Sequence, residues 1–292
     1  MQWSVFGHTQ QKNLLEEILK KGKLSGVYLL SGESGIGKKM FAHDVARHVL
    51  RTDSDIANNP DYMFLMTGIS KDTGKITDIS IDDALRLKRW AYQRPLYGLH
   101  KIAVIDDAEK LSDEAANALL KLLEETPPYV SVFLISSFPR AIISTILSRC
   151  FQIEFSLLAD NDVREVLRAA HLQETDIQLV SSIALGRPGY ALQCVRGDVM
   201  RDIMKASEEL KLFCAQPIAE RLLYTKQLAD HERTGEIILW WLTLARKRML
   251  EDAATAVLVR SLVSVVAHLS ESKNNKRLAL DAFALELPRI SW

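Results

Sequence analysis

The sequence is poor in cysteine and carries no net charge. Its 292 residues include three cysteines, Cys150, Cys194 and Cys214, and no Cys-x-x-Cys pair, which argues against a disulfide framework and against a structural zinc site. The 37 basic side chains balance 37 acidic ones, so no whole-molecule field attracts a nucleic-acid backbone or an anionic membrane. Any contact with DNA must therefore come from a local patch or through partners.

Long apolar runs are missing as well. No stretch is long enough to cross a bilayer, and the first residues, MQWSVFGHTQ, lack a basic region followed by an apolar run. We expect a cytoplasmic protein that makes no contact with membranes. What the sequence does contain is 48% hydrophobic residues, enough for a large core and for two or three domains.

Short apolar runs alternate with helical patterns up to about residue 157. Such runs suit strands buried on both faces of a parallel sheet, and helices are predicted between them at residues 40–50, 81–93 and 113–125, the last with Ser112 as its N-cap. This alternation predicts a doubly wound α/β domain over residues 1–157. The predicted strands are residues 27–30, 62–66, 102–105, 132–135 and 151–155.

After residue 157 the strand signal fades. Two short helices are predicted at residues 160–172 and 175–185, and Gly186-Arg-Pro-Gly189 breaks the chain before a helix that starts at Tyr190. These elements predict a small helical domain at residues 158–200. From residue 201 to residue 292 the pattern is helical throughout, with loops predicted at residues 216–217 and 272–275.

The stretch SGESGIGKKM, residues 31–40, nearly matches the phosphate-binding pattern Gly-x-x-x-x-Gly-Lys-[Ser/Thr]. Gly32, Gly35 and Gly37 let the backbone curl so that its N–H groups point inward, and Lys38 opens a helix whose positive end faces the phosphates. A strand before the loop and a helix after it favour a nucleotide site over the alternative, a glycine-rich turn with a surface lysine.

Lys39 stands where this pattern requires a hydroxyl. In nucleotide-hydrolysing enzymes with this loop the Ser or Thr hydroxyl ligates Mg²⁺, and an ammonium group offers no lone pair to replace it. We therefore expect Mg²⁺ to bind weakly or not at all, and we leave open whether ATP or ADP binds to the loop. The alternative is that Lys39 is solvated and without effect.

Four segments together resemble one protein family: GESGIGKK, KIAVIDDAEKLSDEAANALLKLLEETPP, FPRAIISTILSRCFQIEF and GRPGYA. The chain resembles the clamp-loader branch of the AAA+ proteins and, within it, the delta-prime subunits of bacterial DNA polymerase III, over most of its length. The resemblance implies an AAA+ P-loop domain, a helical lid and an all-α collar domain. It also implies DNA replication and a hetero-oligomeric ring with gamma/tau and delta-like subunits, which meets the sliding clamp and primer-template DNA as a complex.

The resemblance assigns roles to individual residues. Arg149, in the triplet Ser-Arg-Cys, corresponds to an arginine finger that touches the γ-phosphate of ATP on a neighbouring subunit; the alternative is a local ion pair, for instance with Glu154. Asp106 stands where a strand-end aspartate supports Mg²⁺, and Asp107 where ring ATPases carry a glutamate that polarises water. Both could be vestigial, or an ordinary cluster of helix-capping or solvated acids.

Three further positions follow from the same comparison, and one expected feature is missing. Ser136 and Ser137 stand where the family senses the γ-phosphate, and Arg187 lies near its second sensor. A serine at a strand end and an arginine in a Gly-Pro turn are also common without a ligand. Many relatives carry a four-cysteine zinc module after the loop's helix, but RTDSDIANNPDYMF contains no cysteine, so zinc is not expected.

Two main hypotheses remain. In the first, the chain is a delta-prime-like scaffold that donates Arg149 to a neighbouring ATPase and hydrolyses little or no ATP itself, which accounts for Lys39 and Asp107 together. In the second, it is a gamma/tau-type ATPase with an unusual loop. Direct DNA binding has little support, although RLKRWAYQR, residues 86–94, is a local basic segment with aromatic residues.

Overall fold

The computed structural model describes residues 1–52, 55–69, 76–195, 199–250, 252–271 and 276–288. The chain forms two compact units, Met1–Val166 with Gly186–Tyr190, and Leu167–Leu185 with Ala191–Trp292. The segment 158–200, predicted as a domain of its own, is divided between these two units. The loop predicted at residues 272–275 lies outside the described residues.

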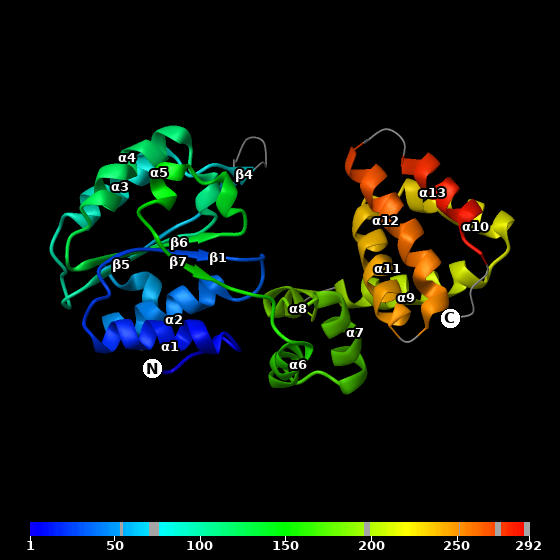
Figure 1. The fold of residues 1–292 in the computed structure, drawn as a ribbon, viewed down its shortest axis with the longest axis horizontal. Helices are drawn as coiled ribbons and strands as arrows, with labels where there is room; N and C mark the ends of the chain where they lie inside the picture. The colour runs from blue at the N-terminus through cyan, green and yellow to red at the C-terminus, as the bar shows by residue number, and fades with distance from the viewer. Residues whose placement is uncertain (53–54, 70–75, 196–198, 251, 272–275, 289–292) are drawn as a thin grey trace. The chain divides into compact units, whose positions relative to one another are not determined.

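A five-stranded parallel sheet forms the centre of the first unit (Figure 1). Its strand order is β2-β5-β6-β1-β7, and β1 pairs with β6 on one side and with β7 on the other. Every residue of β5 and β6 is buried, which explains their continuous apolar runs. The predicted α/β fold and its five strands are confirmed. The strands are β1 Gly26–Ser31, β2 Tyr62–Leu65, β5 Lys101–Ile105, β6 Val130–Ser136 and β7 Phe151–Glu154, and a separate antiparallel pair is formed by β3 Gly68–Ile69 and β4 Ile76–Thr77.

Helices cover both faces of this sheet. Because successive strand residues point to opposite faces, Val27 and Leu29 of β1 pack in the core with α3, α4 and α5, while Tyr28 and Leu30 pack in the core with α1 and α2. Figure 1 shows α1 and α2 below the sheet and α3, α4 and α5 above it. The helices of this unit are α1 Thr9–Lys20, α2 Lys38–Leu50, α3 Ile81–Ala91, α4 Asp113–Glu124 and α5 Ser144–Leu147, with 3₁₀ turns at Ile56–Asn58, Ala108–Lys110 and Pro139–Ala141.

One predicted helix start is confirmed and another departs from the prediction. Ser112 caps α4 as predicted, its hydroxyl accepting from the N–H of Ala115 at 3.1 Å. Helix α8, Pro188–Val195, does not start at Tyr190 as predicted: it begins at Pro188. Proline is favoured at the first helical position, where its missing N–H is not needed, so the break is confined to the residues before Pro188.

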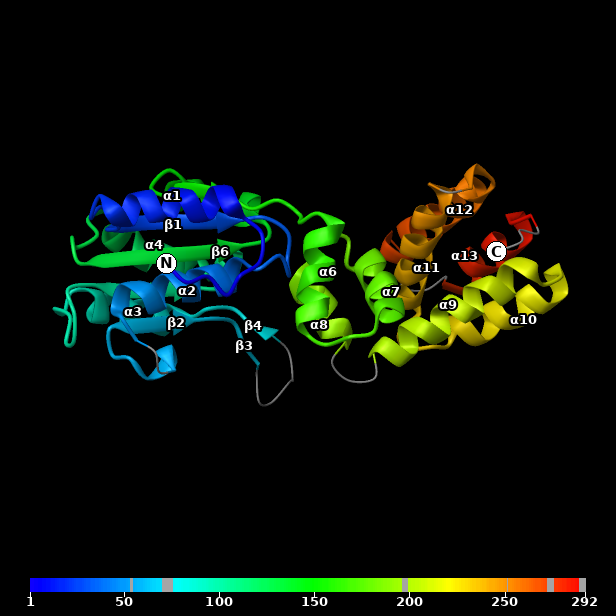
Figure 2. The same cartoon turned by 90° about the horizontal axis from the view of Figure 1, so that it is seen from below.

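The second unit contains helices alone among its described residues. Helix α11 packs on α12 and α9, and α10 packs on α13 (Figures 1 and 2). Its core is aromatic, with Phe213, Trp241 and Phe283 in mutual ring contact. None of the helices in the described ranges is both long and apolar enough to pass through a membrane. The helices after the sheet are α6 Asp160–Ala169, α7 Glu174–Ala184, α8, α9 Val199–Ala215, α10 Ile218–Ala229, α11 Thr234–Met249, α12 Ala256–Glu271 and α13 Lys276–Glu286.

One buried arginine joins distant parts of this unit. The Arg221 side chain is 1% exposed, and its guanidinium donates to the carbonyl oxygens of Phe213 and Cys214 at the end of α9 and to those of Leu287 and Pro288 after α13. The last carbonyls of a helix lack intrahelical partners and form its negative end. A buried cation is therefore balanced here by peptide dipoles.

Candidate functional site

The glycine-rich loop lies between β1 and α2, where the sequence predicts it. Gly32, Gly35 and Gly37 adopt φ values of 141°, 78° and 108°, a region that residues with a side chain rarely enter. A Cβ on Gly32 would stand 2.3 Å from the Phe155 carbonyl oxygen, so this position has no room for a side chain. The loop ends directly on the N-terminus of α2 at Lys38, the positive end of a helix.

The loop is supported from behind by the amino-terminal segment. The ring Nε2 of His8 lies 2.8 Å from the Ile36 carbonyl oxygen; since a carbonyl only accepts, the proton must lie on Nε2. Burial lowers the pKa of His8, which favours the neutral ring. Asp44 of α2 accepts from the N–H groups of Ser4 and Val5 at 2.8 and 3.0 Å. The amino-terminal segment is therefore hydrogen-bonded both to the loop and to the helix that follows it.

Lys38 is turned inward and engaged by its own loop. Its side chain is 5% exposed, and its ammonium group donates to the carbonyl oxygens of Gly32 and of Glu33, the latter at 2.7 Å. The Ser137 hydroxyl lies 3.4 Å away. Burial lowers the pKa of Lys38, opposed by nearby carboxylates, first that of Glu109.

Lys39 forms an ion pair with the strand-end aspartate. Its ammonium nitrogen lies 3.2 Å from Oδ2 of Asp106 and 4.4 Å from the centre of the Phe64 ring, in a cation–π contact. Asp106 is the residue expected to support Mg²⁺, and here the Lys39 ammonium group lies against Oδ2 of its carboxylate. The expectation of a merely solvated Lys39 does not describe this geometry.

Two further carboxylates follow Asp106. Asp107 has φ 53°, and the Thr67 hydroxyl lies 3.4 Å from its Oδ2; burial raises its pKa, and so do the neighbouring charges of Asp106 and Glu109. Glu109 was not identified from the sequence. Its Oε1 accepts from the N–H of Ser137 at 3.1 Å, while its Oε2 is buried without a hydrogen-bond partner among the described residues.

The two serines at the end of β6 differ in their surroundings. The Ser136 hydroxyl accepts from the N–H of Phe138 at 3.0 Å and is buried within its own turn. Ser137 lies between Lys38 and Glu109, and is therefore the one in contact with the loop's lysine.

Arg187 lies next to the loop, on the segment that belongs to the first unit. The Gly189 N–H donates to the Gly35 carbonyl oxygen at 2.7 Å, and a Cβ on Gly35 would approach the Cβ of Arg187 to 3.8 Å. The Arg187 guanidinium stacks on the Tyr190 ring at 4.8 Å. The first turn of α8 thus touches the phosphate loop directly.

Arg149 has its own set of contacts, separate from the loop. Its NH2 group donates to Glu124 of α4, and its NH1 group donates to the Thr145 carbonyl at 2.6 Å and to the Ser148 hydroxyl at 3.1 Å. The carboxylate that pairs with Arg149 is Glu124, and not Glu154, the example suggested from the sequence.

The residues of this site fit a phosphate group better than they fit a metal ion. A glycine loop on a helix N-terminus, with Lys38 inside it, is the arrangement that cradles phosphates, although Lys38 would have to leave the carbonyls of Gly32 and Glu33. Mg²⁺ requires oxygen ligands. The hydroxyl ligand is replaced by Lys39, and the Asp106 carboxylate is paired with that same lysine, so the donor set does not fit Mg²⁺.

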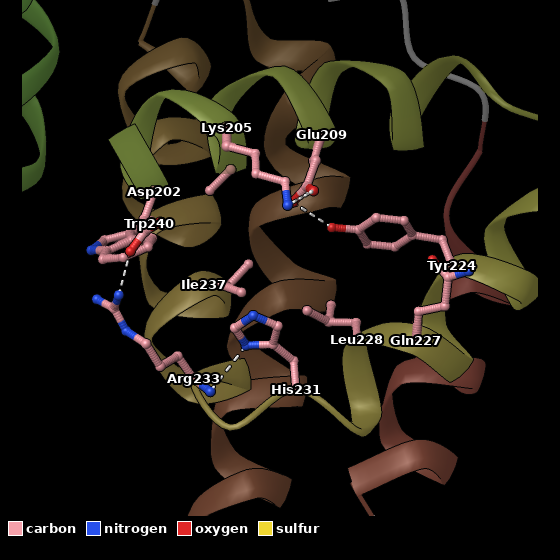
Figure 3. Close-up of a pocket in the computed structure, with 11 residues that line it drawn as sticks. Asp202, Lys205, Glu209, Tyr224, Gln227, Leu228, His231, Arg233, Ile237 and Trp240 are labelled. Atoms are coloured by element: carbon pink, nitrogen blue, oxygen red, sulfur yellow. Dashed lines mark hydrogen bonds and ion pairs between the residues drawn. The ribbon is translucent and has the colours of Figure 1, made fainter. Parts of the chain in front are cut away.

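A second concavity lies in the helical unit (Figure 3). This open cavity of about 400 Å³ is lined by residues of α9, α10 and α11 and of the turn between α10 and α11. Its charged groups are paired with one another: Arg233 with Asp202, and Lys205 with Glu209 at 3.7 Å. Glu209 also accepts from the Tyr224 hydroxyl at 2.7 Å. Internally paired charges of both signs give no preference for a ligand of one sign, so this cavity does not indicate a binding site.

The fold and the loop define the class of this protein. A parallel sheet in this strand order, with a glycine-rich phosphate loop after β1, is the AAA+ P-loop fold. The chain belongs to the DNA polymerase III, delta subunit family, whose model matches residues 7–159. The resemblance read from the sequence motifs is thus confirmed at the level of this family.

Individual relatives support the same placement. The chain is 30% identical over 202 residues to the DNA polymerase III subunit tau of Salmonella typhimurium, a match that covers 62% of the chain and 30% of the relative. It is 30% identical over 168 residues to the subunit gamma/tau of Mycoplasma genitalium, covering 55% and 28%. The chain therefore spans less than a third of the length of these relatives.

A solved structure matches almost the whole chain. A gamma subunit-related protein of DNA polymerase III from Thermotoga maritima aligns with a TM-score of 0.56 and 18% identity, covering 96% of this chain and 99% of that protein. At this identity the match shows the fold, including the helical part after the sheet.

Three residues at the site were missed in the sequence, each for a different reason. Glu109 follows Asp106 by three residues and carries the same charge, a spacing that could have been noticed. Phe64 is indistinguishable from an ordinary strand residue. Glu124 is one of two adjacent glutamates at a helix end, and only the fold brings it to Arg149.

Proposed function

We propose that this protein is a delta-prime-like subunit of the replicative DNA polymerase III clamp loader. It helps to hold a hetero-oligomeric ring with gamma/tau and delta-like subunits, and it donates Arg149 to the ATP site of a neighbouring ATPase. It meets the sliding clamp and primer-template DNA as part of that complex, in the cytoplasm. Family membership supports the clamp-loader part of the proposal.

The ion pair between Lys39 and Asp106 supports the more specific part of the proposal, that the chain is a scaffold and not an active ATPase. The two groups lie 3.2 Å apart, so the carboxylate that would support Mg²⁺ is paired with an ammonium group in a loop that also lacks the hydroxyl ligand. Phosphoryl transfer by this class of protein depends on a metal that bridges the β- and γ-phosphates. We therefore propose that the chain turns over little or no ATP and that any nucleotide binds without Mg²⁺.

Arg149 gives the chain a role in ATP turnover at a neighbouring subunit. A guanidinium forms bidentate, charge-assisted hydrogen bonds with phosphate oxygens, and an arginine from a neighbouring subunit stabilises the charge that develops during phosphoryl transfer. The Arg149 side chain is 31% exposed, so it can be reached from outside the chain.

The competing proposal is a gamma/tau-type ATPase, because the curated relatives named above are gamma and tau subunits. Under that proposal, Lys39 would have to move away from Asp106 when Mg²⁺ and nucleotide bind. Direct DNA binding through residues 86–94 gains little support, since Arg86 pairs with Asp83 at 3.0 Å and the Trp90 indole donates to the Pro60 carbonyl at 2.8 Å.

The first experiment separates these two proposals with the purified chain alone. ATP turnover and nucleotide binding are measured with Mg²⁺ and with EDTA. We expect no turnover and a nucleotide affinity that Mg²⁺ does not improve. Steady Mg²⁺-dependent turnover would refute the scaffold proposal and establish the gamma/tau-type alternative.

The second experiment tests the trans-acting role in the reconstituted clamp loader of the same organism. Arg149→Ala should leave assembly intact and lower turnover at the one ATP site that Arg149 serves by about 10³-fold. Arg140→Ala, which changes an exposed arginine on the preceding turn, is the matched control. Unchanged turnover in Arg149→Ala would show that Arg149 is not the finger.

A further inference from the structure

Arg149 is held by its own chain at the nitrogens that would bind a phosphate. Both terminal nitrogens are engaged: NH2 by Glu124, and NH1 by the Thr145 carbonyl and the Ser148 hydroxyl. Its Nε is buried and has no hydrogen-bond partner in the described part of the chain. Because an arginine grips phosphate with two parallel N–H groups, this conformation has to change before the side chain can grip a nucleotide bound to another subunit.

We propose that Glu124 is a latch that holds Arg149 in this resting position and releases it to the nucleotide of the neighbouring subunit. The inference rests on the proposed trans-acting role of Arg149 and adds to it the residue that controls its availability. Glu124 acts through Arg149 and is a positioning residue, not a catalytic one.

The charge of Glu124 is what singles it out among the three partners of Arg149. The Thr145 carbonyl and the Ser148 hydroxyl are neutral acceptors, whereas the Glu124 carboxylate carries the same sign as a phosphate and competes with it for the same guanidinium. The carboxylate is 47% exposed and the arginine 31% exposed. Exposed ion pairs are weak and sensitive to salt, so a polyanionic triphosphate can displace this one.

The position of Glu124 is unfavourable for its own helix. It is the last residue of α4, where the unpaired carbonyls form the negative end and a carboxylate is repelled. The helix therefore gives no reason for an acidic side chain here, and the contact with Arg149 does.

The test uses Glu124→Gln in the reconstituted clamp loader, which removes the charge while keeping the shape of the side chain. Glu125→Gln is the matched control, because Glu125 is the next residue, is also exposed, and is not among the hydrogen-bond partners of Arg149 in the described residues. We expect kcat/KM for ATP at the served site to rise two- to fivefold in Glu124→Gln, equivalent to about 0.4–1 kcal/mol, and to stay unchanged in Glu125→Gln. The same measurement in an Arg149→Ala background should show no effect of Glu124→Gln, since the latch then has nothing to hold.

Salt distinguishes a latch from a merely structural role. Raising the salt concentration weakens the pair in the native chain, so the ratio of Glu124→Gln to native kcat/KM should fall toward one. Unchanged or lowered turnover in Glu124→Gln, or an effect that persists without Arg149, would overturn the latch. If Arg149→Ala itself has no effect, the proposed function fails, a result distinct from failure of the latch alone.

Discussion

Replacing Lys39 by threonine should make nucleotide binding depend on Mg²⁺. The change removes the ammonium group that lies 3.2 Å from Asp106 and supplies the hydroxyl that the loop pattern requires. The lost ion pair costs little, because Lys39 is 46% exposed and pairs of this kind contribute about 0.2–1 kcal/mol. Asp106 then becomes free to support a metal together with the new hydroxyl.

The size of the effect follows from the coupling between two ligands. Couplings between bound ligands are typically about 1–3 kcal/mol, or about 5–150-fold in affinity. We therefore expect the ratio of the ATP dissociation constant in EDTA to that in Mg²⁺ to be close to one in the native chain and about 5–150 in Lys39→Thr, measured by calorimetry at constant ionic strength.

Lys39→Met is the informative control for this measurement. It removes the ammonium group without supplying a hydroxyl, so its ratio should stay close to one. A ratio close to one in Lys39→Thr as well would refute the reasoning and point to Asp107 or to the engaged Lys38 as the reason for a metal-free site. A large ratio already in the native chain would show that Lys39 leaves Asp106 readily.

Two further predictions concern stability. Arg221→Met should lower the free energy of unfolding by about 3 kcal/mol or more, because it leaves buried carbonyls of α9 and of residues 287–288 without these donors. Urea denaturation measures this free energy, and Arg246→Met, which changes an exposed arginine, is the control. Equal losses of stability in both variants would contradict this account of Arg221. Burial lowers the pKa values of His8 and His43 below 6.5, so the unfolded chain binds protons that the folded chain does not. The free energy of unfolding should therefore fall by up to about 1.4 kcal/mol per ring as the pH is lowered from about 7.5 to 5.5. If urea titrations show a free energy of unfolding that stays constant or increases as the pH is lowered over this range, the assignment is contradicted.

The sheet could be predicted because its signal is local. Strands that are buried on both faces need apolar residues throughout, and the runs in β5 and β6 are therefore visible in the sequence. The same holds for the loop, where the glycines and Lys38 are consecutive. The start of α8 was misplaced because proline was interpreted as a break, although it is favoured at the first position of a helix.

The pairings at the site could not be predicted, since they join residues far apart in the chain. Lys39 could be recognised as a departure from the loop pattern, but its contact with Asp106 depends on how α2 lies over β5. The contact of Arg149 with Glu124 depends on the end of α4 and the turn before β7 meeting above the same face of the sheet. Glu154, which is closer in sequence, was the partner suggested by spacing alone.

The buried Arg221 has a consequence for the order in which the helical unit is completed. Leu287 and Pro288, two of the carbonyl partners described above, lie 66 and 67 residues after it. During synthesis on the ribosome the charge is therefore made long before its last acceptors leave the exit tunnel. Until those residues are made, the guanidinium lacks two acceptors, so burial of Arg221 in this form requires residues 287 and 288 as well as the end of α9.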